Sequence, residues 1–162
     1  MGTTYLILAI CALAAIALQF YFSSKRKQQK KKILAGLTDY AAEHGGTISR
    51  HFEWSDTLIG IDETASKKFF FIRKRPDKEV RKAIDLCDIS KCRVDTVSRT
   101  AGEGKNRQTV IDRVALAITY YDKTRPEDLL EFYNNDYDGF TLNGELQWAE
   151  KWSYIINTSL FR

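Results

Sequence analysis

Hydrophobic and polar residues divide the chain into an apolar head and a mixed body. From Tyr5 to Phe22 the chain carries no charged side chain, and as a helix this run reaches about 27 Å. That length crosses the hydrocarbon core of a bilayer. Tyr5 at one end and Phe20 to Phe22 at the other are aromatic residues of the kind that favour the headgroup level. The pattern predicts a transmembrane anchor over residues 1–24.

A basic block follows the apolar run and indicates its orientation. By the positive-inside rule, positive charge on this flank holds it in the cytoplasm and places the short N-terminus outside. A cleaved signal peptide would need a positive segment before the apolar run, and Met1 to Thr4 has none. The block is also the predicted contact with acidic headgroups of the cell inner membrane. Its members are Lys25, Arg26, Lys27, Lys30, Lys31 and Lys32.

A juxtamembrane helix is predicted next, over residues 26–44. Ile33, Leu34, Leu37 and Tyr40 recur at helical spacing, and two glycines at 45 and 46 supply a stop signal. The chain is therefore expected to divide into an anchor (1–24), a basic juxtamembrane and amphipathic helix (25–46) and a globular domain (47–162).

Strand patterns dominate the first part of the globular domain. The clearest is residues 110–121, where apolar residues alternate over a long run, while residues 67–73 place apolar groups on both faces. We expect residues 78–82 to form a charged loop, residues 129–133 a last strand or one helical turn, and residues 134–139 a loop. The other expected strands are residues 47–54, 57–62 and 92–99, with a short apolar group at 84–89.

A helix closes the chain from Gly144 to about Leu160. Trp148, Trp152 and Ile155 share one face at helical spacing, and both tryptophans are expected to be buried against the sheet. The predicted class is an α+β domain, in which this amphipathic helix caps a bent antiparallel sheet or barrel.

Charge and cysteine content restrict the function further. The chain of 162 residues has a formal net charge of +4, and the basic block alone carries six positive charges. A nucleic-acid-binding domain spreads basic residues over its folded surface, so no nucleic-acid partner is expected. Cys11, Cys87 and Cys92 are too few to frame a zinc site or a disulfide scaffold, and they are expected to be buried thiols in a reducing compartment.

Motifs for chemistry are missing from the sequence. His44 and His51 have no cysteine or regular carboxylate spacing around them, and the chain contains neither a nucleophile elbow nor a P-loop. The acids left for an enzyme are the scattered Asp112, Asp122 and Asp136, and the alternation near Asp136 lacks the helix-loop-helix frame of a calcium site. The prediction is a protein that is not an enzyme, with no catalytic residue, cofactor or metal.

The order of elements, with hairpin strands followed by a tryptophan-bearing C-terminal helix, resembles the pleckstrin-homology-like (PH-like) architecture. The segment Ile84-Asp85-Leu86 after a hairpin also looks like short membrane-anchored bacterial proteins with such domains. Phosphoinositide readers of that family use a Lys on the first strand and a Lys/Arg-x-Arg motif on the second. Lys67 or Lys68 with Arg73-x-Arg75 resembles this pattern, but the spacing is shorter, which favours solvated hairpin charges.

These features together predict a noncatalytic, membrane-tethered interaction or adaptor module. Its partner would be a protein or a second copy of the chain, docking at an open sheet edge or in the groove between sheet and helix. The alternative is a structural subunit of a membrane-embedded secretion or conjugation assembly. Domains of that kind place their helices before the sheet, whereas the long helix here comes last.

Overall fold

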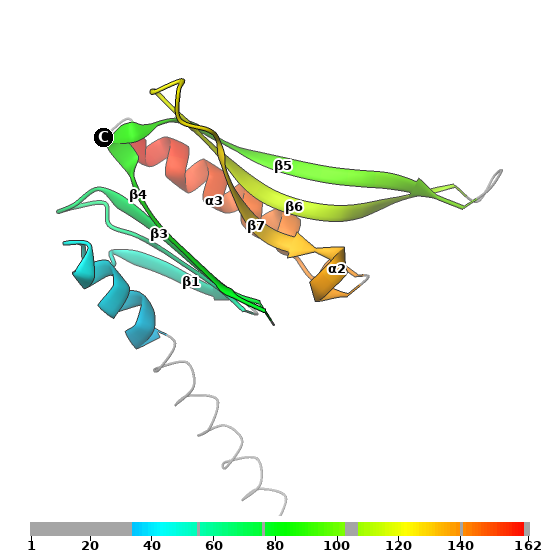
Figure 1. The fold of residues 1–162 in the computed structure, drawn as a ribbon, viewed down its shortest axis with the longest axis horizontal. Coiled ribbons are helices and arrows are strands. Elements are labelled where there is room, and N and C mark those ends of the chain that lie inside the picture. Colours follow the sequence, from blue (N-terminus) through cyan, green and yellow to red (C-terminus); the bar gives the residue numbers. More distant parts are fainter. Residues whose placement is uncertain (1–33, 55, 76, 103–106, 140, 161–162) are drawn as a thin grey trace, which may run out of the picture.

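The computed structural model describes residues 34–54, 56–75, 77–102, 107–139 and 141–160 as an α+β fold with two antiparallel sheets and a C-terminal helix (Figure 1). The first sheet has the order β1-β2-β3-β4 and the second the order β5-β6-β7. The strands are β1 (Arg50–Trp54), β2 (Thr57–Ile61), β3 (Lys68–Lys74), β4 (Glu79–Asp85), β5 (Ile89–Ala101), β6 (Gln108–Tyr120) and β7 (Asp128–Asn134). The 3-10 turn η1 (Leu86–Asp88) separates the sheets, and the labelled helices are α2 (Asn135–Asp138) and α3 (Glu145–Leu160).

The first sheet is covered on both faces, as the double apolar pattern of residues 67–73 predicts. One face of β3 presents Phe69 and Phe71 to the main core, which contains residues of both sheets and α3. The other face presents Phe70 and Ile72 to a second core beneath the helix at residues 34–43. Every residue of β2 is buried for the same reason.

The helix at residues 34–43 packs closely on β2. A Cβ at Gly60 would lie 2.8 Å from Ile48 Cδ1 and 3.1 Å from Leu37 Cδ2, so any larger residue there would require these side-chain ends to shift. The helix ends where predicted, since Gly45 has a φ of 70° and donates its N–H to Ala42 O, while the Gly46 N–H reaches Ala41 O. The rest of the predicted helix, residues 26–33, lies outside the described residues.

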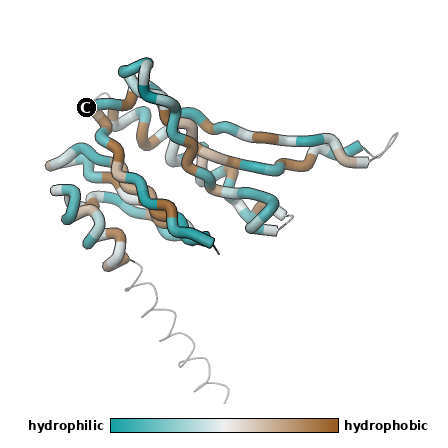
Figure 2. The backbone as a smooth tube through the Cα atoms, in the orientation of Figure 1, coloured by the Kyte–Doolittle hydropathy of each residue, from teal (hydrophilic) through white to brown (hydrophobic). Residues whose placement is uncertain are grey.

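The closing helix α3 is a wedge between the two sheets (Figure 1). It packs against β5, β6 and β7, and its tryptophans contact the first sheet through Phe52–Trp148 and Phe69–Trp152 ring pairs. Trp152 is 2% exposed, as predicted. Trp148 is only partly buried, because it stacks on Phe52 of the edge strand β1 and not on the second sheet. In Figure 2 the hydrophobic residues concentrate within the strands, and the turns are largely hydrophilic.

Two expected loops were wrong. Residues 79–82 of the first expected loop, 78–82, belong to β4, which pairs with β3 along its whole length. As an edge strand, β4 keeps charged residues such as Glu79 and Arg81 in solvent. Its sequence therefore lacks the clear apolar alternation that predicts a strand. Within residues 134–139, α2 forms because the Asn134 side chain caps it by accepting the Asp136 N–H. Residues 129–133, left open between strand and helix, are strand β7.

Within the part of the chain that the structure describes, no helix is long and apolar enough to cross a membrane. The predicted anchor at residues 1–24 lies outside the described residues.

Candidate functional site

The predicted membrane-contact residues Lys25, Arg26, Lys27, Lys30, Lys31 and Lys32 all lie outside the described residues. The candidate sites within the described residues are therefore of another kind. They are a projecting ribbon of two strands and a pocket between the two sheets.

The ribbon forms because β7 is much shorter than the hairpin beside it. Pairing between β6 and β7 ends at Arg113 and Asn134, whereas β5 and β6 remain paired as far as Ala101 and Gln108. Residues 97–101 and 108–112, here called the distal ribbon, thus extend past the last strand of the sheet (Figure 1). Over residues 108–112, β6 pairs with β5 on one side and with no other described strand, so its second edge is open.

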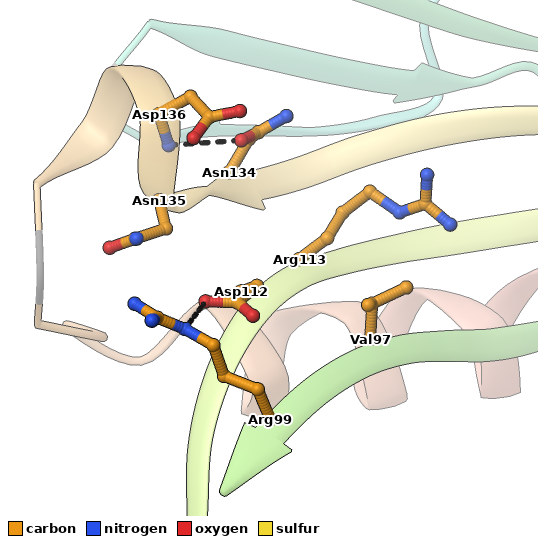
Figure 3. Close-up of a pocket in the computed structure, with 7 residues that line it drawn as sticks. All are labelled: Val97, Arg99, Asp112, Arg113, Asn134, Asn135 and Asp136. Atoms are coloured by element: carbon orange, nitrogen blue, oxygen red, sulfur yellow. Dashed lines mark hydrogen bonds and ion pairs between the residues drawn. The ribbon is translucent and has the colours of Figure 1, made fainter. Parts of the chain in front are cut away.

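A hollow of about 520 Å³ lies at the base of the distal ribbon, where β7 turns into α2 (Figure 3). Val97, Arg99 and Asp112 line it from the ribbon, and Arg113 lines it from the adjoining position on β6. Its charges are balanced, because two arginines face two carboxylates, and the Arg99 Nε–Asp112 Oδ1 distance is 2.9 Å. The residues contributed by the end of β7 and by α2 are Asn134, Asn135 and Asp136.

The second site is a pocket of about 260 Å³ between the first sheet and the corner where β7 turns into α2, here called the inter-sheet pocket. Of the four buried polar residues described, three line it: Thr57, Arg73 and Glu145. Aromatic side chains form part of its wall. These are Trp54, Phe132 and Tyr137, from β1, β7 and α2 respectively.

Arg73 is held in this pocket by opposite charges. Its side chain is 4% exposed and pairs with Asp138, and its Nη1 lies 3.6 Å from Glu131 Oε2. Arg75 pairs with the same Glu131 and lies over the Tyr137 ring at 5.2 Å. The two arginines therefore belong to an internal ion-pair network, and the expectation of solvated hairpin charges was wrong for Arg73. The alternation along β3 explains this, since Arg73 shares its face with Phe69 and Phe71.

Asp62 is the fourth buried polar residue, and it organises the turn between β2 and β3. Its carboxylate accepts backbone N–H groups of Thr47, Thr64, Ala65 and Ser66 at 2.8–3.1 Å. Burial by itself would raise the pKa of Asp62, but these donors outweigh it and hold the pKa well below its usual range. The carboxylate serves the fold, because its partners are all in the adjoining turn and linker.

The cysteines behave differently from one another. Cys92 is buried as expected, and burial raises the pKa of its thiol to about 12. Its backbone is held by α3, because Cys92 N donates to Asn157 Oδ1 at 2.9 Å and Ser153 Oγ donates to Cys92 O at 3.0 Å. Cys87 is exposed, contrary to expectation, because it lies in the turn η1. Cys11 lies outside the described residues.

The remaining sequence candidates are only partly brought together. Asp112 and Asp136 line the ribbon hollow, while Asp122 lies in the turn after β6, where it accepts hydrogen bonds from Thr124. His44 Nδ1 lies 2.9 Å from Tyr40 O, and His51 is exposed on β1. No group of three or more His, Cys, Asp or Glu side chains suited to a metal ion occurs among the described residues.

Sequence reasoning missed the inter-sheet pocket. Its lining residues come from six helices and strands and from two connecting segments between Trp54 and Glu145, and no local spacing relates them. One signal was present: Arg73 continues the alternation of Phe69 and Phe71, which places a charge on a core-facing position.

The chain matches no family model, no curated protein and no solved structure.

Proposed function

We propose that the chain is a noncatalytic, membrane-tethered interaction module at the inner face of the cell membrane. In this proposal the apolar run at residues 5–22 spans the bilayer once, and the basic block holds the folded domain on the cytoplasmic side, near acidic headgroups. The domain then binds a protein partner.

The observation that carries the proposal is the open β6 edge of the distal ribbon. A partner in extended conformation could pair with this edge over residues 108–112 and so continue the line of β7, which stops at Asn134. The adjacent hollow is polar and charge-balanced, which suits the peptide groups and mixed side chains of such a segment. An isolated two-stranded ribbon is only marginally stable in water, and an added third strand would stabilise it.

The order of elements supports a PH-like assignment of the domain. Four strands form one sheet, three form the next, and the long helix follows them all. The position of that helix also favours an interaction module over a subunit of a secretion or conjugation assembly, in which the helices are expected first.

The Arg73–Glu131–Arg75–Asp138 network has a bearing on lipid binding. Because both arginines are occupied by internal carboxylates, we do not propose a phosphoinositide site on β3. Attraction to acidic lipid is assigned to the basic block alone.

Site-specific photo-crosslinking in intact cells tests the docking surface. A photoreactive residue at Gln108 or Thr109, both exposed on β6, should give the same discrete crosslinked protein. The same probe at Tyr154, which is 72% exposed on α3, is the matched control and should not give that product. Crosslinks that arise from Tyr154 and not from the ribbon would contradict the assignment, and a product of twice the chain's own mass would identify the partner as a second copy.

A further inference from the structure

The inter-sheet pocket carries an uncompensated negative charge. Its lining holds one arginine and three carboxylates, those of Asp56, Asp138 and Glu145. Arg73 is already neutralised by Asp138, and Glu131 neutralises Arg75 beside it. The charges left over in the pocket are therefore the carboxylates of Glu145 and Asp56.

Glu145 contributes a buried carboxylate to the lining of this pocket. It is 4% exposed, it accepts the Asn143 N–H, and it is the first residue of α3, where the helix dipole stabilises negative charge. Within the described residues, no basic side chain pairs with it or with the exposed Asp56. A buried carboxylate that accepts one backbone hydrogen bond and has no counterion can still bind a cation.

The aromatic wall favours the same kind of group. Trp54, Phe132 and Tyr137 line the pocket, and π-systems of this kind attract ammonium and guanidinium groups. Tyr137 already takes part in one such contact, with the Arg75 guanidinium. At about 260 Å³ the pocket falls just below the range of small-molecule sites, about 300–1,000 Å³, and suits a single side chain better than a cofactor.

We propose that the inter-sheet pocket binds the cationic side chain of a lysine or arginine presented by a partner protein. The ammonium or guanidinium group lies against Glu145 and Asp56, and its alkyl stem contacts the aromatic wall. That the side chain belongs to a partner protein rests on the proposed function. The pocket itself is a different site from the distal ribbon.

Fluorine NMR of the full chain, labelled with 5-fluorotryptophan in a membrane mimetic, tests this pocket. The chain has three tryptophans, and Trp54→Phe identifies the signal of the one that lines the pocket. The probes are the capped peptides acetyl-Gly-Lys-Gly-amide and acetyl-Gly-Arg-Gly-amide. Both should shift the Trp54 signal saturably and leave the Trp152 signal in place, while a norleucine peptide of similar length should have no effect.

Two variants locate the charge that binds the probe. Glu145→Gln should weaken the Lys peptide about tenfold or more, which is the loss expected for one charge-assisted hydrogen bond. Asp56→Asn, at an exposed position that cannot compromise the core, should weaken it by a smaller factor. Glu150→Gln on the exposed face of α3 is the matched control and should bind as the parent does.

Three results would overturn the proposal. They are equal shifts from the norleucine peptide, preferential binding of a Glu peptide, or unchanged affinity in both Asp56→Asn and a folded Glu145→Gln. A ribbon that crosslinks while the pocket fails these tests leaves the proposed function standing. If the pocket binds the Lys peptide but the ribbon gives no crosslink, the ribbon is refuted as a docking surface and the cation site stands.

Discussion

Replacing Trp152 by alanine should destabilise the domain severely. The side chain is 2% exposed and lies on the face of α3 that meets both sheets, with its ring 6.2 Å from that of Phe69. Truncation removes the aromatic group that fills this junction and leaves a cavity. For large buried aromatics the cost is about 3–5 kcal/mol, against a total of about 5–15 kcal/mol for a typical domain.

Thermal unfolding followed by circular dichroism measures the effect. A loss of this size should lower the Tm by roughly 10–20 °C. Tyr154→Ala is the matched control, because Tyr154 lies on the same helix and is 72% exposed, and its Tm should change by only a few degrees.

The comparison with Trp148 sharpens the test. Because Trp148 is only partly buried and stacks on the edge strand residue Phe52, Trp148→Ala should cost less than Trp152→Ala. An unchanged melting curve for Trp152→Ala would refute the placement of α3 as the wedge between the sheets. A larger loss of stability for Trp148→Ala than for Trp152→Ala would refute it as well.

The remaining predictions concern charge and exposure. Asp62→Asn should destabilise the domain strongly at neutral pH and much less at low pH. Because the pKa of Asp62 is depressed in the folded state, its carboxylate contributes to folding stability above the unfolded pKa of about 3.9, and this contribution is lost as the pH falls below that value. Urea unfolding at several pH values measures the effect. Arg73→Met should cost about 2–4 kcal/mol in urea unfolding by leaving Asp138 without its cation, and adding Asp138→Asn should restore part of the loss. In sealed cells or spheroplasts, a membrane-impermeant maleimide should label Cys87 only after permeabilisation, and Cys92 should stay unlabelled in the native protein, with peptide mass spectrometry as the readout.

Local periodicity was sufficient for the elements that bury one or two continuous apolar faces. The alternation over residues 110–121 predicted β6, and the helical spacing of Trp148, Trp152 and Ile155 predicted α3. It failed at β4, because an edge strand leaves charged side chains in solvent and so has no clear apolar face. The pattern also could not tell one bent sheet from two, since the break depends on the three residues of η1, whose cap is the Asp85 side chain.

The candidate sites depended on information that spacing does not contain. The distal ribbon exists because β7 ends at Asn134 while β5 and β6 continue, a difference in strand length that only the pairing reveals. The burial of Arg73 likewise depends on carboxylates from β7 and α2, far along the chain. A carboxylate from a distant part of the chain can allow a charged side chain to be buried, although the sequence around it predicts a solvated one.

Amide hydrogen exchange of the distal ribbon tests the central claim most directly. In the purified chain, the outward amides of residues 108–112 have no partner strand and should exchange quickly, because the ribbon has two strands and open edges. In native membranes, the same residues should gain protection when a partner strand is present, while β3 and α3 should exchange as they do in the purified chain. Equal exchange of residues 108–112 in both preparations would contradict the account of the β6 edge as a docking site.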